Sequence, residues 1–238
     1  MLIVICKIIL FIFINYVIIS FLEHVIHRFL MHRRILPAYI YTIIPYFTET
    51  FEAHAVRHHR KWYKTFNSET NLIGKEENLK ILLVDTVVIL IGTAPIWVLL
   101  QWLSPLCGFI YPVMVFLHNR LWGLLHRQMH IPGDVFFKNW AVYRFLARYH
   151  FMHHQMTYTN FNVVFPLADL FMRRIAKPRI RDIREMLRLG LLSPRARRGR
   201  ANSEKRLSLN GTPVSIRSHI IGDHTLVRTL KKNLPASF

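Results

Sequence analysis

Residues 2–32 read LIVICKIILFIFINYVIISFLEHVIHRFLMH, and this stretch decides the fold class that the sequence predicts. Its first part, Leu2–Leu22, is a 21-residue apolar run with only three polar interruptions. A helix of about 20 apolar residues spans the hydrocarbon core of a bilayer. A cleaved signal peptide is the alternative, but no small-residue cleavage site follows, and the run leads directly into Glu23, His24 and His27. We therefore predict a transmembrane helix that ends beside histidines.

Further apolar segments extend this pattern. Ile81–Leu103 and Phe109–Leu125 flank the short sequence SPLCG, which is typical of a transmembrane hairpin with a tight turn. Ile35–Phe51 is shorter and contains two prolines, so we expect a kinked or re-entrant segment there. The hairpin turn has no basic residue, whereas His54–Lys80 and the chain after Leu125 are rich in them, which places both in the cytoplasm. The predicted fold is an all-α integral membrane protein whose histidine-rich helical cap lies on the cytoplasmic face.

Charge and aromatic content divide the chain into two parts. The 238 residues are 52% hydrophobic and carry a net charge of +19, from 32 Lys and Arg against 13 Asp and Glu. Of this charge, +13 falls after residue 172, while every aromatic residue except Phe238 precedes that point. We therefore predict a membrane domain over residues 1–172 and a basic tail over residues 173–238, with an amphipathic segment followed by a disordered one.

Several site classes are excluded by composition. The two cysteines, Cys6 and Cys107, both lie in apolar stretches, so neither a disulfide framework nor a cysteine-based zinc site can form. None of the nine glycines belongs to a nucleotide-binding loop.

Histidine is the most informative residue type, because its 14 copies outnumber the 13 acids. Ten of them form four clusters: His27 and His32; His54, His58 and His59; His126 and His130; and His150, His153 and His154. On an α-helix, residues three or four apart share a face, which suits the last three clusters for one metal ion or two neighbouring ions. His27 and His32 are five apart, about 140° round an ideal helix, so that pair requires a helical distortion or ligation of different metals. Ten imidazoles exceed the capacity of one tetrahedral ion, which indicates two metals.

Other interpretations of the histidines are weaker. Buried imidazoles that served only for packing would each need a polar partner. A metal-scavenging histidine tract is local, whereas these clusters are separated by hydrophobic segments. Of the remaining four, His24 could support or replace His27, and His118 lies within an apolar segment, where an ionisable residue suggests a function. His219 and His224, in the tail, are expected to be unrelated to the site.

The order and spacing of the four clusters resemble the fatty acid hydroxylase/sterol desaturase superfamily of membrane enzymes. The resemblance covers Glu23 to about Leu170, including the hairpin between the second and third clusters and the segment Asn160–Asp169 that follows the last. It implies a four-helix membrane anchor under a cytosolic cap. It also implies a centre of two iron ions, with zinc possible in purified protein, that uses O2 to hydroxylate or desaturate a lipid such as a fatty acyl chain or a sterol. Electrons would come from a separate ferredoxin or cytochrome b5 type protein, since the chain has no flavin or nicotinamide fingerprint.

Residues beside the clusters could support such a site. Asp169 is the best candidate for orienting a ligand imidazole, and Asp134, Glu52 and Glu23 are weaker ones. Aromatic residues near the clusters could line a path for the substrate: Trp62, Tyr63, Trp122, Tyr149 and Phe151. Two alternative functions stay open at this point, a zinc-loaded membrane hydrolase and a catalytically inactive membrane protein whose tail recruits a partner.

The tail departs from the family pattern. Ile180, Ile183, Met186, Leu187 and Leu191 recur at helical spacing among arginines, which predicts an amphipathic basic helix suited to an anionic membrane surface. Residues from Ser193 onward are predicted to be disordered. Nucleic-acid binding is disfavoured, because the tail lacks the aromatic side chains on which bases stack.

Overall fold

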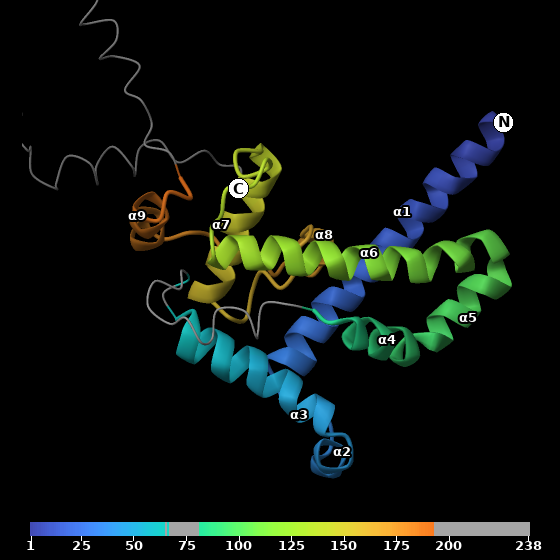
Figure 1. Cartoon of the computed structure of the whole chain (residues 1–238), viewed down its shortest axis with the longest axis horizontal. Helices are drawn as coiled ribbons and strands as arrows, with labels where there is room; N and C mark the ends of the chain where they lie inside the picture. Colours follow the sequence, from blue (N-terminus) through green and yellow to red (C-terminus); the bar gives the residue numbers. More distant parts are fainter. Residues whose placement is uncertain (65, 67–80, 193–238) are drawn as a thin grey trace, which may run out of the picture. The chain divides into compact units, whose positions relative to one another are not determined.

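The computed structural model describes residues 1–64, 66 and 81–192, and every regular element in these residues is a helix (Figure 1). The chain divides into one unit of Met1–Ala176 and a second of Lys177–Phe238. The first unit contains α1 (Leu2–Val25), η1 (Ile26–Met31), α2 (Ala38–Ile43), α3 (Pro45–Phe51), η2 (Glu52–Trp62), α4 (Leu83–Gly92), α5 (Ala94–Leu103), α6 (Pro105–His130), α7 (Ala141–Gln155) and α8 (Leu167–Phe171). The second contains α9 (Ile180–Arg188). The expectation of an all-α chain is therefore met by the described residues.

Helices α1 and α6 are the two long elements at the centre of the first unit. Helix α1 contacts α6 extensively and is continuous with the π-helix η1, so that Leu2–Met31 forms one 30-residue helix. A compact apolar core joins α1 to the hairpin, with Ile19, Leu100, Cys107, Tyr111 and Val115 all buried. The amide nitrogen of Asn15, fully buried in this core, donates hydrogen bonds to the backbone oxygens of Phe11 and Cys107. The Oδ1 atom of the same side chain has no hydrogen-bond partner among the described residues.

The predicted hairpin is present, but its first arm is broken. The stretch predicted as one segment, Ile81–Leu103, contains two helices, α4 and α5, that meet at Thr93 with a bend of 66°. Pro95 at the start of α5 lacks a backbone N–H, which explains a helix break at this position. The turn into α6 lies at Ser104, and Gly108 allows α5 and α6 to pack closely, because a Cβ there would lie 2.5 Å from Gln101 Cα.

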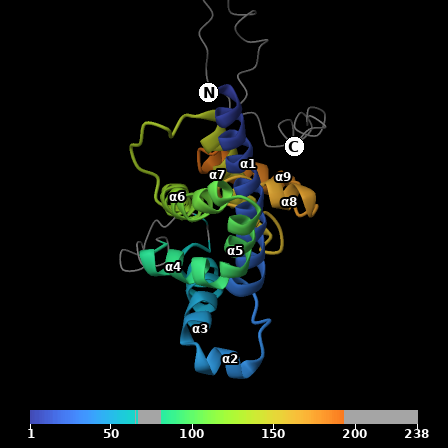
Figure 2. The same ribbon diagram turned by 90° about the vertical axis from the view of Figure 1, so that its right-hand side faces the viewer.

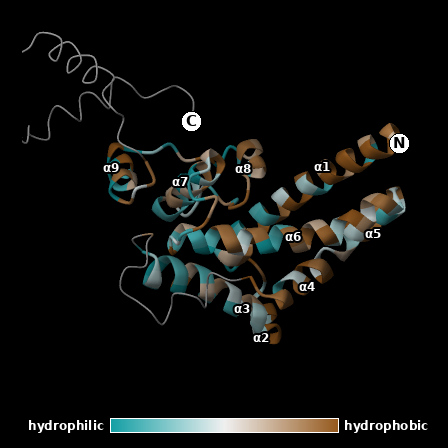
Figure 3. Cartoon of the chain, turned by 45° about the horizontal axis from the view of Figure 1, so that its top comes forward, coloured by the Kyte–Doolittle hydropathy of each residue, from teal (hydrophilic) through white to brown (hydrophobic). Residues whose placement is uncertain are grey.

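The surface of the first unit is strongly apolar at one end. Figure 3 shows brown, hydrophobic residues along the first part of α1, in α5 and in the adjoining part of α6, and teal residues in η2, in α7 and at the other end of α6. Among the described residues, one helix, Leu2–Met31, is long and apolar enough to cross a membrane, or two if the bent α4–α5 pair forms one span. Only 11% of the apolar window in Leu2–Met31 is buried, unlike the core helix of a soluble protein. Exposed apolar surface on this scale is typical of a surface that faces a membrane or another protein.

Residues 35–51 form two short helices rather than a span. Helices α2 and α3 meet at Ile44, whose non-helical backbone leads into Pro45 at the first position of α3 (Figure 2). This arrangement agrees with a kinked segment, because proline is well accommodated in the first turn of a helix and poorly within one. Helix α3 then continues directly into the π-helix η2, which contains three of the clustered histidines.

The second unit is described as far as residue 192. Helix α9 covers most of the predicted amphipathic segment, with Ile183 and Met186 buried and Arg184 exposed. Its first turn is capped by Asp182, whose carboxylate accepts a hydrogen bond from the Arg179 backbone N–H at 2.8 Å. The stretch predicted to be disordered, from Ser193, lies outside the described residues together with His219 and His224.

Candidate metal centre

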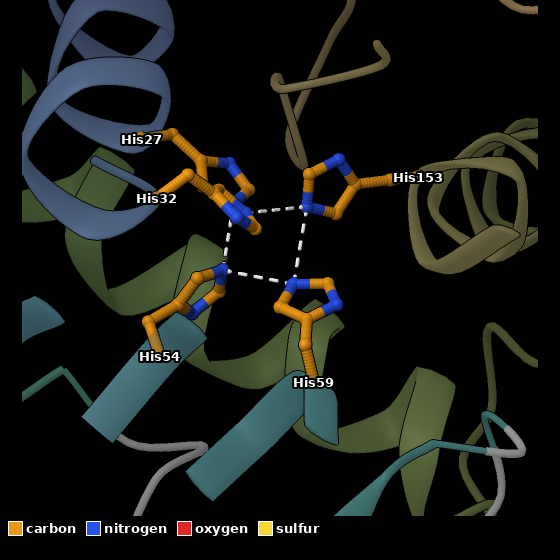
Figure 4. A group of neighbouring side chains, drawn as sticks. All are labelled: His27, His32, His54, His59 and His153. Atoms are coloured by element: carbon orange, nitrogen blue, oxygen red, sulfur yellow. Dashed lines mark hydrogen bonds between the residues drawn. The ribbon is translucent and has the colours of Figure 1, made fainter. Parts of the chain in front are cut away.

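All ten clustered histidines meet at the polar end of the first unit, where η1, η2, α6 and α7 converge. They form two groups of five. The first contains His27, His32, His54, His59 and His153, and the second contains His58, His126, His130, His150 and His154. Within each group, one ring nitrogen from every residue lies within 4.8 Å of the others. Figure 4 shows the rings of the first group pointing toward one another from η1, η2 and α7.

Two π-helices set the register of the first group. A π-helix pairs residues i and i+5, so side chains five positions apart lie on the same face. His27 lies in η1 and His32 directly follows it, so the two share a face. His54 and His59 share a face of η2 in the same way. An ideal helix would place His27 and His32 about 140° apart, so the sequence required a helical distortion to bring them together. The π-helix η1 is that distortion. His54 and His58 were expected to act as an i, i+4 pair. Because η2 is a π-helix, they belong to different groups.

The second group depends on ordinary α-helical spacing. His126 and His130 on α6 share this group, as do His150 and His154 on α7, each pair four residues apart. His153 belongs instead to the first group, because a position one residue away lies about 100° round the helix. Adjacent histidines on α7 and on η2 therefore serve different groups, which brings the two groups next to each other. The stacked rings of His59 and His154, 4.1 Å between centroids, form one of these contacts.

The Nε2 atoms of the first group form a chain of close contacts. His27 and His54 approach to 2.8 Å, His54 and His59 to 3.1 Å, His59 and His153 to 3.2 Å, and His153 and His32 to 2.9 Å. A neutral imidazole has one proton, so its Nε2 either donates one hydrogen bond or presents a lone pair. Five such nitrogens directed at one another cannot all be satisfied by mutual hydrogen bonds. A shared cation would satisfy them.

Backbone carbonyls fix the tautomers of four histidines. The Nδ1–H groups of His27 and His153 donate to the backbone oxygens of Phe161 and Thr159, the latter at 2.7 Å. In the second group, His130 Nδ1 donates to Phe66 O at 2.6 Å. His154 Nδ1 donates to Tyr63 O at 3.2 Å. Because the single proton of each neutral ring is at Nδ1, each Nε2 presents its lone pair to the centre, as a metal ligand must.

Three of these carbonyls depend on unusual backbone conformations. Asn160, with φ of 56°, separates the carbonyl-bearing residues Thr159 and Phe161, and asparagine tolerates this left-handed conformation better than most residues. Phe66 itself has φ of 73°, which is costly for a bulky residue. The sequence did not predict any of these four carbonyl groups, because every residue has a main-chain oxygen and the residue type does not mark the ones that bond a histidine.

The second group contains the strongest sign of an unmet ligand requirement. His126 is fully buried, yet neither of its ring nitrogens has a hydrogen-bond partner in the described structure. Its neighbours contact each other, His58 with His154 at 3.1 Å and His130 with His150 at 3.0 Å between Nε2 atoms. An unpartnered buried imidazole is costly unless something binds it. These donor atoms fit a metal ion that prefers imidazole nitrogen, such as iron, zinc, copper or nickel.

Burial keeps these histidines neutral. It lowers the pKa of His153 from 6.5 to about 4, although the hydrogen bond to Thr159 and the nearby Asp169 act in the opposite direction. Burial, with smaller contributions from neighbouring imidazoles, holds the pKa well below 6.5 for His54, His58, His59, His150 and His154. Neutral rings are the form that ligates metals, so at pH 7 few protons would have to leave when an ion binds.

Asp169 supports the site through His24 and not through one of the ten. Its fully buried carboxylate accepts hydrogen bonds from His24 Nδ1 at 2.6 Å, Tyr149 Oη at 2.8 Å and the Asn162 backbone N–H at 2.7 Å. These contacts tie α1 to α7 and to the segment that carries the Phe161 carbonyl. Asp169 was expected to bond one of the clustered histidines directly. Backbone carbonyl oxygens bond four of these histidines instead.

The other predicted acids also bond elsewhere. Glu52 pairs with Arg34, and Asp134 is exposed and pairs with Lys138. Glu23 accepts hydrogen bonds from Asn162 Nδ2 and the Val163 N–H, and lies 3.4 Å from His118 Nε2. The predicted functional histidine His118 thus contacts an acid and not the clustered histidines.

Two cavities reach the histidine groups. The first is apolar and lies between α1, α4 and α6, with Ile19, Leu22, Ile89 and Val115 in its wall beside His27 and Trp122. The Trp122 ring lies 4.3 Å from the His126 ring, at an interplanar angle of 41°, so this cavity adjoins both groups. The second is mainly polar and opens over His32, His59 and His154. Of the five aromatic residues predicted to line a substrate path, only Trp122 borders the apolar cavity. Tyr63 and Phe151 are fully buried.

Fold and site together define an all-helical protein with two adjacent histidine groups that could hold metal ions. No protein-family model, curated protein or solved structure matches the chain. The function must therefore be argued from the geometry of the site.

Proposed function

We propose that this protein is an O2-dependent membrane oxidoreductase with two metal ions, functionally iron, that hydroxylates or desaturates a lipid. One observation carries the proposal: ten imidazoles, eight of them buried, form two adjacent groups of five whose ring nitrogens converge. Five nitrogen donors exceed the four ligands of a closed structural zinc site and the three protein ligands of a catalytic zinc site. The order of the histidine clusters, which resembles the fatty acid hydroxylase/sterol desaturase superfamily, supports the choice of reaction.

Each group would hold one ion. His27 and His153 in the first group, and His130 and His154 in the second, are already held in the tautomer that ligates through Nε2. The other six complete the two sets, and not all need bind at once if a position is to stay open. When bound, iron would supply the O2 activation and one-electron chemistry that oxidation of an unactivated C–H bond requires.

The chain's own residues supply two further requirements. Burial keeps the imidazoles neutral. The apolar cavity beside His27 and Trp122 adjoins helices whose outer surfaces are apolar, so a lipid chain could enter from a bilayer without crossing water. Electrons would come from a separate redox protein, a ferredoxin or a cytochrome b5 type protein, since the sequence has no flavin or nicotinamide fingerprint.

Metal analysis combined with oxygen consumption tests the proposal. We expect about two irons per chain after reconstitution, and lipid oxidation that requires both O2 and an electron donor. A double variant His153→Ala, His154→Ala removes one ligand from each group and should abolish turnover, whereas deletion of residues 177–238 should leave it intact. Zinc-dependent hydrolysis under anaerobic conditions would overturn the proposal in favour of a hydrolase. A phenotype lost with the tail but kept by the double variant would favour a partner-recruiting membrane protein.

A further inference from the structure

The polar cavity over the histidine groups is surrounded by positive charge. Its volume is about 240 Å³, more than ten times the roughly 10–15 Å³ that one water requires. Three arginines line it, Arg28, Arg33 and Arg60, together with Thr157 and Tyr158. The three histidines in its wall come from both groups, so a ligand held here lies directly beside the candidate metal centre.

These arginines differ from others close to them in the sequence. Arg34 pairs with Glu52, and Arg57 pairs with Glu49. Within residues 1–64, 66 and 81–192, by contrast, Arg28, Arg33 and Arg60 form no ion pair. Arg33 and Arg60 are exposed and Arg28 is partly buried. Like charges around one cavity repel one another, and an anion between them would relieve this repulsion.

Contacts connect one of these arginines to the first histidine group. The guanidinium of Arg28 lies 6.0 Å from the centroid of the Phe161 ring. That ring in turn lies 5.6 Å from the ring of His153 and 6.1 Å from the ring of His32. The Phe161 ring would therefore lie between an anion bound to Arg28 and the first group.

We propose that Arg28, Arg33 and Arg60 form an oxyanion subsite that takes a phosphate or carboxylate group beside the two histidine groups. Guanidinium groups bind these anions through paired N–H donors. A recessed cavity suits a small anionic group better than the flat acidic surface of a protein does. The assignment of this anion to the headgroup of the oxidised lipid rests on the proposed function, whereas anion binding itself does not. The substrate would then be an anionic amphiphile, with its chain in the apolar cavity and its headgroup in the basic one.

Calorimetric titration of the full chain in a neutral detergent tests the subsite. The probes are inorganic phosphate, palmitate and uncharged methyl palmitate, each added to metal-loaded and to metal-stripped protein. We expect the anionic probes to bind in both states, and Arg60→Gln to weaken this binding roughly 10- to 100-fold, the effect of losing one charge-assisted hydrogen bond. Arg57→Gln, on the same helix but paired with Glu49, is the matched control and should change the affinity less than twofold.

The outcomes separate the two proposals. Palmitate that binds more tightly than phosphate, with no binding of its methyl ester, supports a lipid headgroup. Phosphate that binds as tightly as palmitate, with the same arginine dependence, supports the subsite and assigns it to a free anion. Equal losses in Arg57→Gln and Arg60→Gln, or binding only when metal is present, would overturn the subsite. Metal content measured on the same samples reports on the proposed function, so its failure is recognised independently.

Discussion

Removal of two ligands from one histidine group should eliminate one metal ion and leave the other. His54→Ala, His59→Ala takes two donors from the first group, both from η2. The matched pair His126→Ala, His130→Ala takes two donors from the second group, both from α6. Each double variant retains three imidazoles in the altered group and five in the other.

The expected loss of affinity follows from the number of ligands. A four-ligand structural zinc site binds with an apparent free energy of about 10–16 kcal/mol, so each ligand contributes roughly 2.5–4 kcal/mol. Loss of two ligands should therefore weaken the altered site by roughly 10⁴- to 10⁶-fold. The intact group should change far less, because its five donors lie within 4.8 Å of one another and include none of the substituted residues.

Elemental analysis after equilibration with a chelator measures this effect. Wild-type protein and the control His118→Gln, a histidine outside both groups, should retain about two metals per chain, and each double variant about one. Far-ultraviolet circular dichroism checks that the helices persist. The two-site interpretation would be refuted if either double variant lost both metals at the same chelator concentration, or if both variants kept two.

Three other properties can be predicted from the structure. Because the pKa of His153 falls from 6.5 to about 4 on folding, the unfolded chain binds more protons between these values. Thermal melts of the metal-free protein should thus show stability that is full above pH 6.5 and falls toward pH 4, by roughly 3 kcal/mol for this residue. Gly108→Ala should lower stability by about 1–3 kcal/mol, since its Cβ would lie 2.5 Å from the backbone of α5. Gly92→Ala, with no atom within 4 Å of the new Cβ, should not be destabilising in the same melts. Asp169→Asn should cost about 1–3 kcal/mol, because it removes one acceptor oxygen from a fully buried group that accepts three hydrogen bonds. The exposed Asp134→Asn should leave the melting temperature nearly unchanged. Equal melting temperatures for the two aspartate variants would contradict the structural role of Asp169.

The apolar pattern predicted the helical class and the hairpin well, and predicted helix boundaries less well. The turn at Ser104 follows from sequence, because the apolar runs stop there and proline begins the next helix. The 66° bend at Thr93 was not predicted, because both sides of it are equally apolar and only Pro95 marks the helix break there. The partners of Asp169 could not be predicted for a related reason, because position in the sequence does not show which donors a buried carboxylate meets. Its histidine partner is His24, which is not one of the ten clustered histidines.

The sequence by itself determined which residue type forms the site and which ten copies of it are available. Their spacing also signalled that His27 and His32 could share a metal only if the helix were distorted. Tertiary structure decided how the ten divide, because the division depends on π-helical register in η1 and η2 and on contacts between residues up to 126 positions apart, such as those of His27 with His153. It also decided the ring orientations, since these depend on backbone carbonyls that are brought close only by folding. A residue-type pattern records which ligands are available, whereas their positions and protonation are set by packing.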